Sequence, residues 1–159
     1  MKKKYIAIIG CGRISGHHYR SIESVDGLEI IAVCDLIEEK AKAYADEFDI
    51  KYYTNYHKML DKLSKIDIVV IATPSGMHFE HAMDVMENYN KSVIIEKPTF
   101  MRPDQLNLAY DKAQELGLDI FPVLDLGIDP RFPRQFETFG EDPLMIKRFG
   151  EAMIKGYQG

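Results

Sequence analysis

A glycine-rich turn near the start of the chain is its most distinctive chemical feature. The apolar run at residues 5–9 leads into residues 10–15, Gly-Cys-Gly-Arg-Ile-Ser, and a stretch of helical period follows. Gly10 permits a tight turn, Gly12 has no side chain to block a pyrophosphate, and the helix start offers free N–H groups to phosphates. The small Ser15 still permits close packing of the helix on the strand. The residues predicted to contact a dinucleotide here are Gly10, Gly12, Arg13 and Ile14.

An acidic residue stands where a dinucleotide site needs a partner for the adenosine ribose. Asp35 closes the apolar run 29–34, 23 positions after Gly12, near the roughly 20 positions typical of a carboxylate that binds ribose hydroxyls. This carboxylate would repel the 2′-phosphate of NADP, and Leu36 and Ile37 supply no arginine to receive one. The pattern therefore favours NAD over NADP. A glycine turn with only a structural role is the alternative.

Alternating apolar runs and helical stretches supply the frame for these residues. Strands are expected at 5–9, 29–34, 51–53, 68–72, 92–96 and 120–124, and helices at 14–25, 38–48, 56–63, 77–88 and 103–116. The continuous Ile and Val content of the strands suits burial on both faces, as in parallel sheets. The repeated strand–helix order predicts a single α/β domain, residues 1–159, with a Rossmann-like doubly wound parallel sheet of about six strands.

Two further polar segments follow apolar runs. Residues 72–78 read Ala-Thr-Pro-Ser-Gly-Met-His, and residues 96–98 read Glu-Lys-Pro. Together with the glycine turn, these motifs make the chain resemble the glucose-fructose oxidoreductase/inositol dehydrogenase family (Gfo/Idh/MocA). The resemblance covers roughly residues 4–123. Within that family, the motifs are similar to the branch that oxidises nucleotide sugars at C3.

The resemblance implies roles for the residues at these strand ends. Lys97 would stand at the catalytic centre, where a lysine can orient a sugar hydroxyl or help to remove its proton. Open α/β sheets bind their ligands at this edge, which agrees with that role. The alternative is that Lys97 is a solvated strand end and Pro98 only a strand breaker. The residues implied to line the cofactor are Thr73, Pro74, Ser75, His78, Glu96 and Lys97.

Composition and charge exclude other classes of partner. The chain has 159 residues, 46% of them hydrophobic, and a net charge of −5, which argues against a nucleic-acid surface. No apolar run approaches the roughly 20 residues that a membrane helix needs. The first residues do not read as a signal peptide. We therefore expect a cytoplasmic protein, monomeric or a weak homodimer, with NAD(H) as its partner.

The cysteines and histidines have mainly structural interpretations. Cys11 and Cys34 each end an apolar strand and are predicted to be small buried residues, with a redox pair as the minor alternative. His78 and His81 suggest a metal pair, but no third ligand stands nearby, so no metal is expected. The neighbours His17 and His18 are predicted to be surface or packing residues of the first helix rather than catalysts.

The last part of the chain resembles a second family. Residues 121–125, 129–134 and 136–143, with the distinctive Phe-Glu-Thr-Phe-Gly-Glu-Asp-Pro, look like a strand–loop–helix segment of the (β/α)₈ barrel of family 3 glycoside hydrolases. Ile128 stands where that family has a sugar-binding arginine, and Pro133 where it commonly has a glycine. The nucleophilic aspartate of that family has no counterpart in this chain. The carboxylates interpreted as loop and cap residues are Asp125, Asp129, Glu137 and Glu141.

A chimera is the economical explanation of the two resemblances. Residues 1–120 would derive from the oxidoreductase and residues 121–159 from a barrel βα unit, with a seam between about residues 118 and 125. The unit would end in a helix that has Asp142 as its N-cap and Pro143 at its first position. An engineered recombination of fragments is favoured over a natural fusion or a chance resemblance.

Three functions follow from this interpretation. The first is an NAD(H)-binding module without turnover, in which Lys97 is vestigial, because the substrate domain of the resembled family has no counterpart here. The second is a designed chain that folds and binds no ligand. The third is a residual NAD-dependent sugar dehydrogenase that uses Lys97. The first two rank close together, and turnover ranks well behind them.

Overall fold

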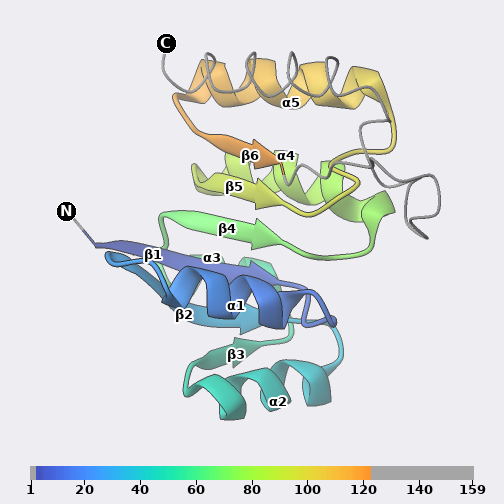
Figure 1. Ribbon diagram of the computed structural model, residues 1–159. Coiled ribbons are helices and arrows are strands. Elements are labelled where there is room, and N and C mark those ends of the chain that lie inside the picture. The colour runs from blue at the N-terminus through green and yellow to red at the C-terminus, as the bar shows by residue number, and fades with distance from the viewer. Residues whose placement is uncertain (1–2, 123–159) are drawn as a thin grey trace.

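The structure is a computed structural model that describes residues 3–122. These residues form one sheet with helices on both of its faces (Figure 1). The elements, in chain order, are β1 (Lys4–Ile9), α1 (Ser15–Glu23), β2 (Leu28–Cys34), α2 (Glu38–Phe48), β3 (Lys51–Tyr53), α3 (Tyr56–Lys62), β4 (Ile68–Ile71), the 3₁₀ turn η1 (Ser75–Met77), α4 (His78–Tyr89), β5 (Ser92–Ile95), α5 (Pro103–Leu116) and β6 (Ile120–Pro122).

The six strands pair in the order β3-β2-β1-β4-β5-β6, and every pair is parallel. The chain winds outward from β1 in one direction and then, after returning to β4 beside β1, in the other. This confirms the predicted Rossmann-like doubly wound sheet. The winding direction reverses between β1 and β4, and a sheet of this kind opens its ligand crevice at the carboxyl ends of the strands at that point.

Alternation of side chains along β1 gives the sheet an apolar core on each face. Ile6 and Ile8 are fully buried on the face that α1 and α2 cover. Ala7 and Ile9 belong to the larger core on the opposite face, which α3, α4 and α5 cover. A strand buried on both faces needs continuous apolar sequence, which is why the runs of Ile and Val predicted these strands well.

The residue types at the two ends of α5 explain where this helix begins and where it ends. Pro103 occupies the first turn, where a missing N–H costs nothing, and Gly117 ends the helix in the left-handed region at φ 65°. The helix predicted at 103–116 has the same bounds as α5. Along α5, Ala109 and Ala113 are buried four residues apart against the sheet.

Small boundary differences have local causes. The predicted helix 77–88 begins at His78, because residues 75–77 form a 3₁₀ turn in which the Met77 N–H donates to the Pro74 carbonyl at 2.8 Å. The predicted strand 92–96 ends at Ile95, so that Glu96 begins the loop after β5. Because Glu96 lies outside β5, its side chain does not have to follow the alternation between the two faces of the sheet.

The predictions for the last part of the chain fall mostly outside the described residues. Of the predicted barrel-derived segment 121–159, Phe121 and Pro122 are described, and both belong to β6. Of the proposed seam, between about residues 118 and 125, the structure describes the residues up to 122. The loop carboxylates and the helix predicted to begin at Pro143 lie outside the described residues.

Candidate cofactor site

Gly10 makes the turn after β1 possible for two separate reasons. Its backbone lies at φ +100°, a region that residues with a Cβ rarely adopt, and a Cβ built there would lie 2.5 Å from the Ala72 carbonyl oxygen. The turn is held in place by hydrogen bonds at both of its ends: the Gly10 N–H donates to the Cys34 carbonyl at 2.7 Å, and the buried Ser15 hydroxyl donates to the Gly10 carbonyl at 2.5 Å. Ser15 thereby adds a hydrogen bond to the close packing predicted for it.

Gly12 lies on the open side of the same turn. A Cβ built on Gly12 meets no protein atom within 4 Å. Ile14, the N-cap of the helix α1 that follows, makes no side-chain cap hydrogen bond, and the first turn of α1 contains no acidic residue. Backbone donors and the positive end of the helix dipole are therefore available in front of Gly12, as the binding of a pyrophosphate requires. Beside them, Arg13 is exposed and Ile14 is half-buried.

A tyrosine that the sequence interpretation missed supports the turn from the neighbouring helix. The Tyr44 hydroxyl, on α2, donates to the Gly12 carbonyl at 2.5 Å. Burial, the largest influence, raises the pKa of Tyr44, so the hydroxyl stays a donor. Tyr44 stands 32 residues from Gly12, and no local pattern marks such a contact.

Asp35 joins the end of β2 to the glycine turn. One carboxylate oxygen accepts the Cys11 N–H at 2.8 Å, and the other accepts the Ile37 N–H at 2.9 Å. The side chain is half-buried. Each carboxylate oxygen has a second lone pair, so Asp35 can accept ribose hydroxyls while it holds the backbone.

The segment after β4 passes directly over the glycine turn. Ala72 is the residue whose carbonyl approaches Gly10, and the predicted cofactor residues Thr73, Pro74 and Ser75 come next. Pro74 is exposed, while Thr73 and Ser75 are half-buried. The Thr73 hydroxyl lies 3.0 Å from Nδ1 of His81, and burial lowers the pKa of His81, which favours the neutral imidazole.

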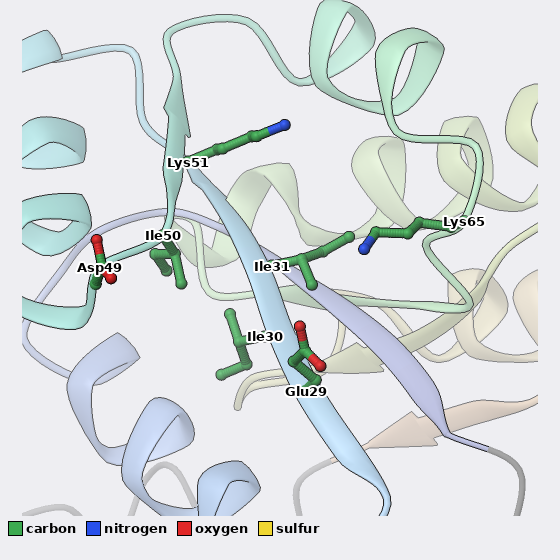
Figure 2. Close-up of a pocket in the computed structure, with 7 residues that line it drawn as sticks. All are labelled: Glu29, Ile30, Ile31, Asp49, Ile50, Lys51 and Lys65. Carbon is green, nitrogen blue, oxygen red and sulfur yellow. The ribbon is translucent and has the colours of Figure 1, made fainter.

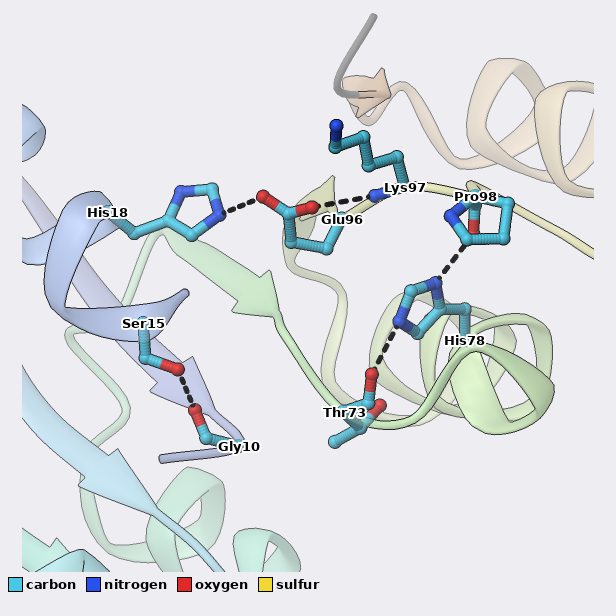
Figure 3. A network of polar contacts seen from close by, with 8 residues as sticks. All are labelled: Gly10, Ser15, His18, Thr73, His78, Glu96, Lys97 and Pro98. Carbon is cyan, nitrogen blue, oxygen red and sulfur yellow. Dashed lines mark hydrogen bonds and ion pairs between the residues drawn. The ribbon is translucent and has the colours of Figure 1, made fainter. Parts of the chain in front are cut away.

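Glu96 is a buried carboxylate with two partners. Its Oε1 lies 2.8 Å from Nε2 of His18 on α1, and its Oε2 accepts the Lys97 N–H at 2.9 Å (Figure 3). Burial acts to raise the pKa of Glu96, but the hydrogen bonds from His18 and Lys97 and their charges outweigh it and lower the pKa below its usual value. Glu96 is therefore a carboxylate that fixes the backbone from which the half-buried Lys97 projects.

His78 lies between the same two loops. It is 1% exposed, and its ring nitrogens face two backbone carbonyls, those of Thr73 and Pro98 (Figure 3). Pro98 follows Lys97 through a cis peptide bond. The structure thus places His78 among buried backbone groups, whereas Thr73, Ser75 and Lys97 keep partial exposure.

The site residues predicted from the sequence come together at one edge of the sheet. The glycine turn, the end of β2 and the segments after β4 and β5 are connected by the hydrogen bonds and contacts described above. His18 was expected to be a surface or packing residue, and its contact with Glu96 was not anticipated. His18 and Glu96 stand 78 positions apart, so no local periodicity marks their contact. His17, its neighbour, is exposed as predicted.

Two cysteines lie close to the candidate site: Cys11 is in the glycine turn, and Cys34 is the last residue of β2. Cys11 and Cys34 are buried and not linked to each other. Burial, followed by the charge of Asp35, raises the pKa of each thiol to about 12, so both stay protonated and unreactive.

Within residues 3–122, no group of three or more His, Cys, Asp or Glu side chains is arranged to hold a metal ion, and no helix is long and apolar enough to cross a membrane.

A hollow of about 390 Å³ lies at the opposite, amino-terminal edge of the sheet (Figure 2). Its lining mixes isoleucines with charges of both signs: Glu29, Ile30, Ile31, Asp49, Ile50, Lys51 and Lys65. The charges are partly engaged elsewhere, since Glu29 pairs with Lys3 and Lys65 lies over the Tyr5 ring. Nothing in this lining converges on one chemical group, and we assign it no role.

Comparison with known proteins gives one matching family model and several similar dehydrogenases. Residues 4–122 match the family model Gfo/Idh/MocA, described as an oxidoreductase family with an NAD-binding Rossmann fold. Inositol 2-dehydrogenase of Salmonella paratyphi B is 34% identical over 94 residues, which are 57% of this chain and 27% of that protein. D-glucoside 3-dehydrogenase of Escherichia coli is 30% identical over 113 residues, 70% of this chain and 32% of that protein.

A solved dehydrogenase structure also superposes on this chain. The WlbA dehydrogenase from Bordetella pertussis, crystallised in complex with NADH and UDP-GlcNAcA, superposes with a TM-score of 0.71 at 29% identity, covering 77% of this chain and 37% of that one. The chain spans about a third of the length of the curated relatives it matches. Only residues up to Pro122 fall within the match to the family model.

Proposed function

Because the chain belongs to the Gfo/Idh/MocA family of oxidoreductases with an NAD-binding Rossmann fold, we propose that it works by holding NAD(H) across the carboxyl ends of β1, β2, β4 and β5. The observation that carries this proposal is the contrast between the two glycines. Gly10 is required by the protein's own backbone, whereas Gly12 has no protein neighbour that forbids a side chain. A ligand that approaches the backbone closely, such as a pyrophosphate, explains the second glycine.

The described residues divide into two halves along a dinucleotide. Gly12, the start of α1 and Asp35 would hold the pyrophosphate and the adenosine ribose. Thr73, Ser75 and Lys97 would line the nicotinamide half, because the loops after β4 and β5 continue the edge on the other side of β1. Asp35 favours NAD over NADP, since a 2′-phosphate would meet its carboxylate in a turn whose neighbours Leu36 and Ile37 bring no positive charge.

The substitution Gly12→Ala tests the proposal. A methyl group at Gly12 has space in the free protein, so the melting temperature should stay as in the wild type. The same methyl group would collide with the pyrophosphate, and overpacking of about 1–3 kcal/mol corresponds to a loss of about 5-fold to 150-fold in affinity. NADH and ADP-ribose titrations followed by calorimetry should both show this loss.

Gly10→Ala is the comparison variant. It should lower the melting temperature, because its Cβ would meet the Ala72 carbonyl and its φ is unfavourable. Equal affinity of wild type and Gly12→Ala for NADH, or no binding by the wild type at millimolar concentrations, would contradict the proposed function. Binding of NADPH as tight as NADH would contradict the role given to Asp35.

Hydride transfer to or from a sugar is the second candidate function, and the position of Lys97 favours it. Bound NAD⁺ would accept the hydride. Glu96 and His18 fix the backbone at Lys97, whose ammonium form can orient a substrate hydroxyl and whose neutral amine form can accept the proton of that hydroxyl. Proteins named inositol 2-dehydrogenase and D-glucoside 3-dehydrogenase, and a dehydrogenase crystallised with NADH and UDP-GlcNAcA, carry segments that match this chain.

The test of turnover is the appearance of NADH absorbance when the chain is mixed with NAD⁺ and a nucleotide sugar, a glucoside or inositol. A signal that disappears in Lys97→Ala and persists in Lys42→Ala, an exposed lysine of α2, would establish the dehydrogenase. A flat trace with all three substrate classes would remove it.

We also propose, from sequence alone, that residues 121–159 derive from a glycoside hydrolase barrel and complete the sheet as a βα unit. The resemblance of residues 136–143 to that family supports this proposal. A crystal structure of the whole chain tests it: a helix that begins near Pro143 and packs beside β6 agrees, and any other path contradicts it. If the chain folds cooperatively and ignores NAD(H), the alternative of a designed chain without a ligand replaces the binding proposal.

A further inference from the structure

His78 makes two contacts that a neutral histidine cannot both satisfy. Its Nε2 lies 2.7 Å from the Thr73 carbonyl oxygen and its Nδ1 lies 2.9 Å from the Pro98 carbonyl oxygen (Figure 3). Both partners are acceptors only. A neutral imidazole carries one N–H, so one of the two distances would then bring a lone pair against a carbonyl oxygen. The imidazolium form donates to both.

Burial makes this arrangement costly unless both contacts are hydrogen bonds. His78 is 1% exposed, and a buried polar group without a partner destabilises the folded chain. Two charge-assisted donors to carbonyl oxygens compensate the burial of the cation. His81, one turn further along α4, lies against the Thr73 hydroxyl, and burial lowers its pKa, which favours a neutral ring beside His78. Glu80 and Asp84 on the same helix act on His81 in the opposite direction.

The two carbonyls belong to the two loops that would enclose the nicotinamide. Thr73 follows β4, and Pro98 follows Lys97 after β5. The strands themselves are already paired, and the Glu96 N–H donates to the Ile71 carbonyl at the last rung of the ladder. Beyond that rung the strands end, and the imidazole of His78 bridges the two segments at the level of Lys97.

We propose that His78 is a positioning residue: as an imidazolium it donates to the Thr73 and Pro98 carbonyls and sets the separation of the loops on either side of the nicotinamide, without contacting the cofactor itself. The proposal rests on the proposed NAD(H) binding and assigns the buried histidine a different task from that of the glycine turn. It predicts a selective defect. The nicotinamide half loses its frame without His78, whereas the ADP-ribose half, held by Gly12 and Asp35, does not.

The experiment compares NADH with ADP-ribose in His78→Phe. Phenylalanine keeps a ring of similar size and supplies no donor. We expect the affinity for NADH to fall by about tenfold, as for the loss of hydrogen bonds of ordinary strength, and the affinity for ADP-ribose to stay within about twofold. His17→Phe, at an exposed position of α1, is the matched control and should change neither affinity. An equal loss for both ligands, or no loss for either, would overturn the proposal.

A second measurement needs no variant of His78 and no cofactor. In the wild-type chain labelled with ¹⁵N-histidine, long-range ¹H–¹⁵N spectra at neutral pH should show both ring nitrogens of His78 carrying protons. Substitutions of the other histidines one at a time assign the signal. A single protonated nitrogen would refute the bridge even if NADH binds. Failure of the wild type to bind either ligand would contradict the proposed function, and the spectrum would then decide the role of His78 by itself.

Discussion

Glu96 shows how a single side chain can organise a strand end. It lies in the first loop position after β5, accepts a hydrogen bond from His18 on α1, and accepts another from the backbone N–H of Lys97. The carboxylate therefore connects the helix that begins at the glycine turn with the segment that carries the lysine. Its lowered pKa means that folding favours the ionised form.

Glu96→Gln should make the stability of the chain respond differently to pH. The folded-state pKa of Glu96 is depressed, so its contribution is fully present above the unfolded value near 4.5 and is lost as pH falls through the folded value. At pH 7 the variant should be less stable by about 1.5–3 kcal/mol, the range for hydrogen bonds to a charged group. Urea unfolding at several pH values measures the difference, which should shrink below the unfolded pKa.

Glu80→Gln, at an exposed position of α4, is the control for this experiment and should leave the pH profile unchanged. A stability gap between wild type and Glu96→Gln that stays constant from pH 7 down to acid unfolding would show that ionisation of Glu96 does not contribute.

The helices end where backbone conformation requires it. Three helices are followed by residues in the left-handed region: Asp49 after α2 at φ 52°, Asn90 after α4 at φ 53° and Gly117 after α5 at φ 65°. Asp and Asn tolerate this conformation at some cost, and glycine adopts it freely. Gly117 is the clearest case, because a Cβ there would meet no protein atom and any penalty is purely conformational.

Gly117→Ala should therefore destabilise the chain by about 1–2 kcal/mol, the cost of a left-handed residue with a Cβ. Thermal unfolding by circular dichroism measures this loss. Gly76→Ala is the matched control, since Gly76 also has open space around its Cβ position but does not lie at positive φ. If the two variants lose the same stability, the conformational explanation is wrong.

At the scale of the whole molecule, the double winding of the sheet gathers the residues of the candidate site at the carboxyl ends of the strands. The strand order brings the ends of β1, β2, β4 and β5 beside one another, although their residues are up to 87 positions apart, from Gly10 to Lys97. Two apolar cores hold this sheet, one on each face. The central strand β1 contributes to both and is fully buried at Ile6, Ala7 and Ile8.

Truncation in the centre of the sheet should therefore be severe. Ile8→Ala removes buried methyl groups with little room for the core to collapse, and should cost about 2–5 kcal/mol. Leu108→Ala, which is 53% exposed on α5, should change stability by no more than about 0.5 kcal/mol. Urea unfolding of both variants measures the change in the free energy of unfolding. The comparison requires that this free energy fall with urea concentration at the same slope in both variants. A cost at Ile8 as small as that at Leu108 would show that the described core does not determine the stability.

Local pattern was enough to predict much of this chain, because a parallel strand buried on both faces must be continuously apolar and a phosphate-binding turn must lack side chains. Those two requirements are met by neighbouring residues, so the six strands and the glycine turn after β1 could be predicted without coordinates, and the roles given to Gly12 and Asp35 stay predictions. The matching family model agrees with the NAD prediction.

The partners of those residues could not be predicted in this way. The contacts of Tyr44 with Gly12, His18 with Glu96 and His78 with Pro98 join segments 20 to 78 residues apart. Each depends on how helices pack on the sheet and where strands end, which no local periodicity encodes. His78 illustrates the difference: its place in a motif marked it as a candidate, and only the tertiary structure reveals the two carbonyl oxygens that face its ring.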